Sequence, residues 1–354
     1  MRVAILTTSY PSRAGDPAGH FVRAEALELA RAGHHVHVLA PAAGRPALDD
    51  DAVQLWPMPH GGVFGWPGAA SRLRQSPWRA PGAAAFALRA ADRLSSMQPD
   101  LIVAHWLVPS GAPIALRARS DAELECVAHG ADVRLLCRVP AALRELVLRR
   151  LLDRASRIRF VAASLLHDLC ASVPRELRLR VERVAVVQPC AIHLPDVSLR
   201  AAELRRTYGA RHLLTTVGRL VPGKRVELAV QAANLIGRDV RLCVLGDGPE
   251  RDRLRAFDLV GNVRFTGAVD RNEALAWMAA STAVIHASAQ EAAPTVVREA
   301  RMLRVPVVAC DAGDVATWAR ADAGIHVVAP SARAIAAAVQ SLRSARGQMQ
   351  LDWQ

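Results

Sequence analysis

One loop of the chain has the composition of a phosphate-binding site. Residues Gly218 to Arg225 have the sequence GRLVPGKR, which contains the spacing G-x-x-x-x-G-K of a phosphate-binding loop. Glycines let the backbone approach an anion, and the side chains of Arg219 and Lys224 supply positive charge. Arg225 stands where a nucleotide triphosphatase has a magnesium-binding serine or threonine, which argues against triphosphatase chemistry. The alternative is an ordinary turn that carries two surface cations.

Lys224 is also the only lysine of the chain. The chain has 45 basic residues, and the remaining ones are all arginine. A single lysine in so arginine-rich a chain indicates a site that needs a compact ammonium rather than a planar guanidinium. Chance retention is the alternative, and the position of Lys224 in a phosphate-type loop favours a function.

A pair of glutamates forms the second candidate site. Glu291 follows the predicted strand Ala283–Ala287, and Glu299 lies on the helix that Pro294 begins. The rise from Pro294 to Glu299 is about 7.5 Å, so the two carboxylates can reach separate parts of one long ligand. The alternative is a helix with an acidic first turn, and spacing alone does not separate the two. The glycine turn that begins at Gly246 is typical of a tight strand-to-helix connection.

The sequence gives little indication of metal or thiol chemistry. The six cysteines are scattered without a C-x-x-C pair, which disfavours structural zinc and a disulfide framework. Asp49–Asp51 contains a D-x-D string, interpreted here as a solvated turn. The sequence therefore predicts no metal site and no cofactor.

The elements that must position these residues alternate between strand and helix along the whole chain. This alternation predicts an α/β protein of two doubly wound Rossmann-like domains facing a central cleft. The boundary is expected within Ile192–Arg200, which divides the chain into domains 1–195 and 196–354. Residues Gly44–Pro81 are predicted to be a long irregular insertion. The predicted strands are Arg2–Thr7, His35–Leu39, Leu101–His105, Leu124–His129, Ile158–Ala163, Val184–Gln188, Leu213–Val217, Val240–Leu245, Val263–Thr266, Ala283–Ala287, Pro306–Ala309 and Ile325–Val328, and the predicted helices include Phe21–Ala32, Ala83–Ser96, Ala141–Ala155, Leu165–Ser172, Val226–Leu235 and Ala332–Ser344.

Composition and charge narrow the range of partners. The 354 residues are 51% hydrophobic and 22% charged, which excludes a disordered chain and allows two cores. The net charge of +12 suits phosphorylated substrates, anionic membranes or nucleic acid, but the aromatic content of 4% disfavours a surface that stacks single-stranded bases. No apolar run is long enough to cross a bilayer, and the start lacks a signal peptide, so a cytoplasmic location is expected.

Taken in order, these motifs resemble those of the family 4 glycosyltransferases, which have the GT-B fold. Gly218-Arg219, Lys224, the turn GDGP at 246–249 and Glu291-x7-Glu299 carry the resemblance in the second half. In the first half it is carried by TSYP at 8–11, GHFV at 19–22, PDLIVAHW at 99–106 and HGADV at 129–133. The resemblance implies metal-free transfer of a sugar from a nucleotide diphosphate sugar to a glycan or lipid-linked acceptor, with retention of configuration.

The resemblance also implies roles for individual residues. Gly218, Arg219 and Lys224 would bind the diphosphate, and Glu299 would bind the ribose hydroxyls. Gly19 would let the first loop approach the diphosphate or the acceptor. The first domain would then bind the acceptor and the second domain the donor.

Two residues would act at the reacting sugar. By the same resemblance, Glu291 would contact the donor sugar and His129 would lie beside it. Cations that stabilise the departing diphosphate and acids beside an oxocarbenium-like sugar suit this chemistry. Without the resemblance, His129 is simply a polar residue that ends a strand.

The chain differs from the family pattern at several positions. Ala292 and Arg304 stand where the family usually has small residues, and Asp314 replaces the second glycine of a Gly-Gly pair. Cys190 lies in a segment, PCAI, where the family has Asn-Gly-Val-Asp. These positions bear on the identity of the donor sugar. A nucleotide-sugar-binding or membrane-associated accessory protein of the same fold is the alternative function.

A basic stretch suggests contact with a membrane. Residues Arg138–Arg159 have seven arginines and two acids, a local net charge of +5. Their apolar residues gather on one side of a helix, as in helices that lie on anionic lipid. The hypothesis is peripheral attachment to the inner face of the cell membrane through Arg149, Arg150, Arg154 and Arg157. The alternative is that the apolar side packs on the sheet of its own domain.

Overall fold

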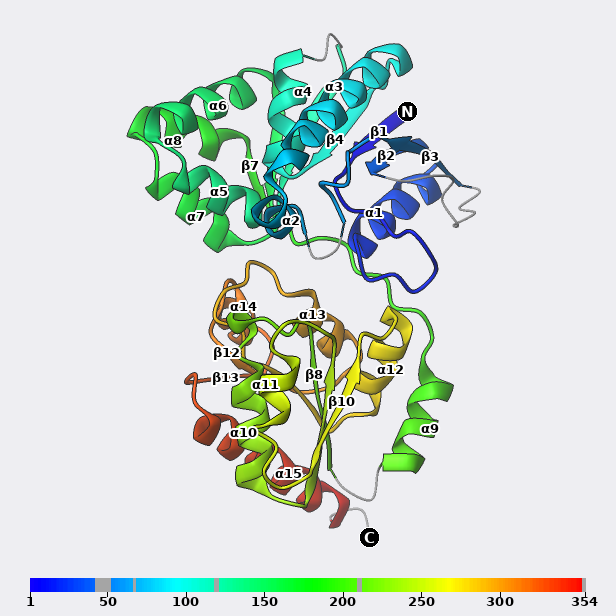
Figure 1. The fold of residues 1–354 in the computed structure, drawn as a ribbon, viewed down its shortest axis with the longest axis vertical. Helices are drawn as coiled ribbons and strands as arrows, with labels where there is room; N and C mark the ends of the chain where they lie inside the picture. The colour runs from blue at the N-terminus through cyan, green and yellow to red at the C-terminus, as the bar shows by residue number, and fades with distance from the viewer. Residues whose placement is uncertain (42–51, 66–67, 118–120, 209–211, 352–354) are drawn as a thin grey trace. The chain divides into compact units, whose positions relative to one another are not determined.

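The computed structural model describes residues 1–41, 52–65, 68–117, 121–208 and 212–351. The chain divides into two compact units, Met1–His193 and Leu194–Gln354 (Figure 1). The division falls inside the segment Ile192–Arg200, where the alternating pattern of strands and helices is interrupted. Each unit is an α/β structure built on its own parallel sheet.

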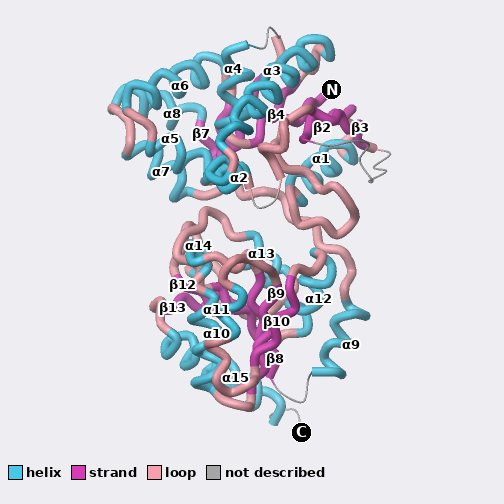
Figure 2. Tube along the Cα trace, viewed as in Figure 1, coloured by secondary structure: helices cyan, strands magenta, loops and turns pink. Residues whose placement is uncertain are grey.

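The first unit contains a seven-stranded sheet in the order β3-β2-β1-β4-β5-β6-β7, and its strand pairs are all parallel. Helices follow most of its strands, as parallel connections require (Figure 2). Its strands are β1 Arg2–Leu6, β2 His35–Pro41, β3 Val53–Met58, β4 Leu101–His105, β5 Glu123–Ala128, β6 Arg157–Phe160 and β7 Ala185–Val187. Its helices are α1 His20–Arg31, α2 Ala69–Gln75, α3 Ala80–Met97, α4 Ala112–Arg117, α5 Ala131–Arg138, α6 Ala141–Arg154, α7 Ala163–Ala171 and α8 Arg175–Val184.

The second unit contains a six-stranded parallel sheet in the order β10-β9-β8-β11-β12-β13. Its strands are β8 His212–Val217, β9 Val240–Leu245, β10 Val263–Gly267, β11 Ala283–His286, β12 Val307–Cys310 and β13 Ile325–Val328. Its helices are α9 Ser198–Tyr208, α10 Val226–Ile236, α11 Arg251–Arg255, α12 Arg271–Ala280, α13 Thr295–Met302, α14 Val315–Ala319 and α15 Ala332–Leu351.

The core of the second unit shows why this sheet is covered on both faces. Leu213 packs in one apolar cluster with residues of α9, α12 and α13. Its neighbour Leu214 packs in another with residues of α10 and α15. Because successive side chains of a strand point to opposite faces, a strand that is buried along its length needs helices on both sides. The buried runs of β8, β9 and β11 therefore specify a doubly wound sheet.

Both sheets reverse their strand order once. The reversal lies between β1 and β4 in the first unit and between β8 and β11 in the second. In open α/β sheets, ligands bind outside the carboxyl ends of the strands at such a point. The loops after β1, β4, β8 and β11 are therefore the places where this fold presents functional residues.

The prediction of an irregular insertion at Gly44–Pro81 is wrong. This segment contains the edge strand β3, the helix α2 and a short 3-10 turn at Pro77–Arg79. Pro57 hides the strand in the sequence, yet an edge strand tolerates a proline that a central strand would exclude. The D-x-D string of Asp49–Asp51 lies outside the described residues.

Candidate functional site

The loops after β8 and β11 meet at the reversal point of the second sheet. Pro222–Lys224 form a tight 3-10 turn directly before α10. The Lys224 Nζ donates a hydrogen bond to Glu291 Oε1 at 2.5 Å, so two residues predicted separately from the sequence lie in contact. The Ala289 backbone N–H also donates to the Gly223 carbonyl at 2.8 Å, which joins the loops through their backbones.

The glycine turn after β9 supports the phosphate-type loop. A Cβ on Gly246, whose φ is +134°, would lie 1.9 Å from the Gly218 carbonyl oxygen. The Leu220 N–H donates to the Asp247 carbonyl at 3.0 Å, so the two loops are bonded as well as packed. The Gly-x-Gly-Pro pattern, weak in the sequence, thus sets the path of residues 218–220.

A buried histidine also lies beside Glu291 at this site. The imidazole of His286 is 4% exposed, and its Nε2 lies 3.7 Å from Glu291 Oε1. Burial lowers the pKa of His286 to about 4, so it is neutral at pH 7. Burial opposes ionisation of Glu291, but the charge of Lys224 outweighs it and holds the pKa of that carboxyl below its usual value. His286 ends an apolar strand and carries no motif that sequence reasoning could use.

Glu299 is held by Arg271, a residue that no sequence motif indicates. It is buried on α13, 5% exposed, and its Oε1 accepts from Arg271 Nε at 3.1 Å and from the terminal guanidinium nitrogen at 2.7 Å. Arg271 is the first residue of α12, which follows β10. Arg219 is exposed beside the Gly218 turn. The structure therefore brings Lys224, Gly218 and Glu291 together and places Glu299 in an ion pair with Arg271.

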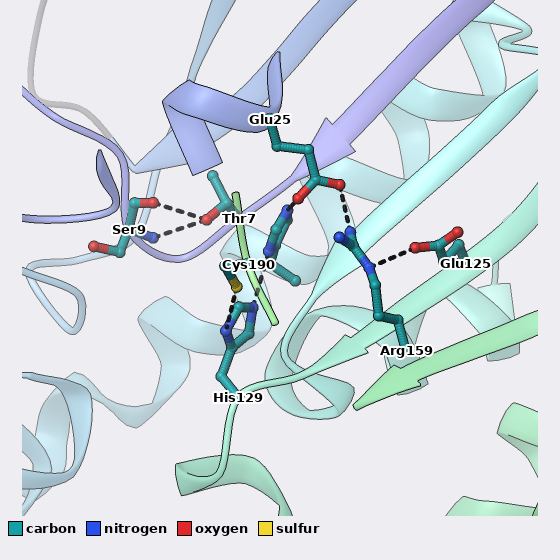
Figure 3. A network of polar contacts seen from close by, with 8 residues as sticks. Thr7, Ser9, Glu25, Glu125, His129, Arg159 and Cys190 are labelled. Atoms are coloured by element: carbon teal, nitrogen blue, oxygen red, sulfur yellow. Dashed lines mark hydrogen bonds and ion pairs between the residues drawn. The ribbon is translucent and has the colours of Figure 1, made fainter. Parts of the chain in front are cut away.

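In the first unit, Gly19 allows a close approach within its own loop. A Cβ on this residue, whose φ is +64°, would lie 2.2 Å from the Ser9 carbonyl oxygen. The Thr7 hydroxyl donates to that same carbonyl at 2.8 Å (Figure 3). Gly19 is thus required for the fold of the loop after β1, whatever the loop binds.

His129 follows β5 and is fixed at both its backbone and its ring. The buried Asp132 carboxylate accepts from the backbone N–H groups of His129, Gly130 and Leu107, and so ties the loops after β4 and β5 together. The His129 Nε2 lies 2.9 Å from His105 Nδ1, and its Nδ1 lies 3.8 Å from the Cys190 sulfur (Figure 3). Burial, with His105 and Arg159 nearby, keeps the pKa of His129 well below its usual value.

Within the residues that the structure describes, no group of three or more histidine, cysteine or acidic side chains is placed to hold a metal ion. Among the same residues, no helix is long and apolar enough to cross a membrane.

Two family models cover most of the chain. The model "Glycosyltransferase Family 4" matches residues 18–189, and "Glycosyl transferases group 1" matches residues 204–353. The chain is a family 4 glycosyltransferase. Both units contribute to this assignment, and the fold is GT-B, as predicted from the motif order.

Curated relatives of this glycosyltransferase carry the same activity in their names. A Bacillus subtilis protein described as a teichuronic acid biosynthesis glycosyltransferase is 26% identical over 357 residues, which cover 96% of this chain and 88% of that protein. A GDP-mannose-dependent alpha-mannosyltransferase of Mycolicibacterium smegmatis is 41% identical over 120 residues, which cover 33% of this chain and 30% of that protein.

Solved structures show the same fold. Sucrose-phosphate synthase from Thermosynechococcus elongatus matches with a TM-score of 0.73 and 18% identity, over 97% of this chain and 90% of that one. The Anabaena protein HepE in complex with UDP matches with a TM-score of 0.69, 18% identity and the same coverage.

One departure of this glycosyltransferase from the family pattern has a visible structural cost. Arg304 adopts a left-handed backbone with φ of +60°, directly after α13. Glycine takes this conformation without strain, and most other residues do so at a cost of about 1 kcal/mol. The Ala292 carbonyl, in contrast, fits closely against Gly313, where a Cβ would lie 2.1 Å away.

The apolar side of the basic helix α6 is not available to a membrane. Leu148 and Leu151 are fully buried inside the first unit, and Ile158 on the following strand is buried as well. The apolar side of the helix that suggests lipid binding in the sequence is therefore the side that packs on the core. The outward side carries a different apolar pair, Leu143 and Leu146, which are 49% and 54% exposed.

Most of the arginines named for membrane contact have partners in the protein. Arg149 donates to Glu176 at 3.1 Å, and Arg154 donates to the Ala122 carbonyl at 2.7 Å. Arg157 lies 3.5 Å from Glu125, and Arg150 is exposed on α6.

Proposed function

We propose that this glycosyltransferase moves a sugar from a nucleoside diphosphate sugar to a glycan or lipid-linked acceptor, with retention of configuration. The observation that carries the proposal is the Lys224–Glu291 pair at the strand-order reversal of the second sheet. Lys224 provides a cation for the diphosphate of such a donor, and the adjacent Glu291 provides a carboxylate for its sugar.

The departing diphosphate gains negative charge as the sugar leaves. Lys224 and Arg219 would stabilise that charge, because charge-assisted contacts strengthen as the bond to the sugar breaks. Glu291 would lie along the sugar and favour its oxocarbenium-like state. Glu299, oriented by Arg271, would accept hydrogen bonds from the ribose hydroxyls. The UDP complex of HepE and the GDP-mannose dependence of the mycobacterial relative support a nucleoside diphosphate donor.

The first unit would supply the acceptor side of the reaction. Gly19 shapes the loop after β1, and His129 is held after β5, so both lie in loops at the carboxyl ends of the first sheet. Retention requires the new bond to form on the face that the diphosphate leaves. His129 would then contact a hydroxyl of the reacting sugar rather than act as the leaving group's acid, because its pKa is low.

The test is a donor panel. UDP- and GDP-sugars are incubated with the wild-type chain and a pool of glycan and lipid-linked acceptors, with and without EDTA. We expect release of UDP or GDP from one class of donor, unaffected by EDTA, and a product whose anomeric configuration by NMR matches the donor. Tight binding of a nucleotide sugar without any release would instead identify an accessory protein that only binds it. A rate that EDTA abolishes and magnesium restores would contradict the metal-free mechanism.

We further propose that α6 contacts anionic lipid through its outward face. Leu143, Leu146 and Arg150 share that face by their spacing along the helix, and the two leucines are about half exposed. Apolar side chains beside a cation suit the interface of an anionic bilayer.

Vesicle sedimentation tests this contact. The wild-type chain should bind vesicles containing anionic lipid at low salt, and L143S/L146S should bind them several-fold less. The matched control is L135S, because Leu135 is 52% exposed on the neighbouring helix α5. Equal binding to anionic and neutral vesicles, or a loss in the control as large as in L143S/L146S, would contradict the proposal.

A further inference from the structure

A line of polar groups runs behind His129 in the first unit. It begins at Glu25 on α1, passes through His105 at the end of β4, and ends at the Cys190 thiol beyond His129 (Figure 3). His105 is fully buried, and its Nε2 lies 3.7 Å from Glu25 Oε2. Such a line of groups can decide which ring nitrogen of His129 carries the proton.

Glu25 is held as an acceptor by an arginine. Arg159 forms an ion pair with Glu25, and its Nε lies 2.8 Å from Glu125 Oε1. An ionised carboxylate accepts hydrogen bonds and donates none. Burial lowers the pKa of His105 to about 3, and Arg159 adds to the effect, so this imidazole is neutral and carries one ring proton.

That proton has only one favourable position. Neither His105 Nε2 nor Glu25 Oε2 has a hydrogen-bond partner within the described part of the chain, and the 3.7 Å between them is longer than a hydrogen bond. A proton on Nε2 points at the carboxylate and is attracted by its negative charge. A proton on Nδ1 would leave a nitrogen lone pair facing a buried anion, and burying unsatisfied polar groups is costly. His105 Nδ1 is therefore the acceptor in its contact with His129, and the His129 Nε2 is the donor.

We propose that Glu25 and His105 are positioning residues that hold His129 as the tautomer protonated on Nε2, so that its Nδ1 accepts a hydrogen bond from a hydroxyl of the donor sugar. This inference rests on the proposed function, in which His129 lies beside that sugar. The Cys190 thiol faces Nδ1 at 3.8 Å. Because a thiol is a weak donor, a sugar hydroxyl can replace it at little cost.

The rings around His129 support a fixed orientation. Trp106 and Phe21 lie with ring centroids 4.6 and 5.1 Å from that of His129, and the ring of His105 is stacked at 5.1 Å. These contacts, together with the backbone hydrogen bonds to Asp132, fix the orientation of the His129 ring. Glu25 and His105 then control only its tautomer.

The decisive variant is Glu25→Gln. Arg159 has only donors, so it should keep the amide oxygen of the new side chain and turn the amide nitrogen toward His105. That nitrogen donates to His105 Nε2, which moves the His105 proton to Nδ1. His105 then donates to His129 Nε2, and the His129 proton moves to Nδ1. Ring-nitrogen NMR of histidine-labelled protein, with His105 and His129 assigned by their loss in single variants, reads both tautomers directly.

Glu125→Gln is the matched control, because it removes the same charge beside the same arginine without facing His105. We expect the wild type and Glu125→Gln to carry the His129 proton on Nε2, and Glu25→Gln to carry it on Nδ1. The kcat for sugar transfer should fall about 10²- to 10³-fold in Glu25→Gln, as when a single preorganised hydrogen bond to the transition state is lost. Donor KM should change little, and thermal unfolding should change by a similar amount in Glu25→Gln and Glu125→Gln, because both remove a carboxylate from Arg159.

Each outcome decides something separate. A wild-type His129 protonated on Nδ1, or a Glu25→Gln variant with the wild-type tautomer, overturns the proposal. An inverted tautomer with unchanged kcat contradicts the catalytic part of the proposal, because transfer would then not depend on the tautomer of His129. If the wild-type chain transfers no sugar at all, the proposed function fails, and the NMR result still decides the tautomer.

Discussion

Lys224 and Glu291 form an ion pair whose two halves should affect binding of a nucleoside diphosphate in opposite directions. Their side chains are 25% and 18% exposed, so the pair is partly screened by solvent. Lys224→Ala removes a charge-assisted contact to the diphosphate and should weaken binding of UDP or GDP by about 1–3 kcal/mol, or about 5- to 150-fold in Kd. Glu291→Gln removes the carboxylate that competes with the diphosphate for the ammonium. That competition is worth about 1–2 kcal/mol for a partly exposed pair, so Kd should tighten by about 5- to 30-fold.

Isothermal titration with UDP and GDP measures both effects, because neither ligand has the sugar that Glu291 is proposed to contact. The charge control is Arg238→Ala, an exposed cation before β9 at the opposite edge of the same sheet. It should leave Kd within about twofold of wild type, because exposed charges farther apart than the Debye length are largely screened. Equal affinities for wild type and Lys224→Ala would refute the assignment of the phosphate site. A loss of affinity in Glu291→Gln as large as in Lys224→Ala would refute the competition.

Three further predictions concern the fold around the site. Arg304→Gly should raise the free energy of unfolding by about 1 kcal/mol in urea titrations, because it relieves a left-handed backbone, and a loss of stability would show that the strain is absent. Gly246→Ala should weaken binding of UDP or GDP more than tenfold, because its methyl group would displace the Gly218 carbonyl. Gly237→Ala, at a residue whose φ of +88° is also positive but which has open space around it, should leave that affinity unchanged, and equal effects would contradict the steric argument. His105 and His286, with pKa values of about 3 and 4, stay neutral in the fold while the unfolded chain protonates both, so the free energy of unfolding should fall by about 2 kcal/mol for each between pH 7 and 5. His286→Gln should flatten that slope, and an unchanged slope would contradict a neutral buried His286.

The local sequence predicts the doubly wound fold and the first site residues because both depend on short patterns. Apolar strands such as Val240–Leu245 need cover on both faces, and Lys224 stands in a loop of recognisable spacing. Neighbouring loops carry Lys224 and Glu291 because β8 and β11 pair, so their contact follows once the strand order is known.

Residues that act through tertiary contacts cannot be predicted from such local patterns. Arg271 reaches Glu299 from a separate helix, and His286 is one polar residue in an apolar strand. Glu25 and Arg159 are separated by 134 residues in the chain, and nothing local to either indicates their ion pair. The prediction that the apolar side of α6 lies on lipid is wrong for a related reason. The amphipathic pattern of a helix is the same whether Leu148 faces lipid or the core.

Hydrogen–deuterium exchange with a bound donor tests whether a nucleoside diphosphate sugar binds at the strand-order reversal of the second sheet. Addition of UDP-glucose or GDP-mannose, whichever the donor panel identifies, should slow exchange of the backbone amides in residues 218–225 and 287–299. The turn at residues 237–239, at the opposite edge of that sheet, should exchange as before. Slowed exchange elsewhere, with residues 218–225 and 287–299 unchanged under a saturating donor, would show that the donor does not bind at this reversal.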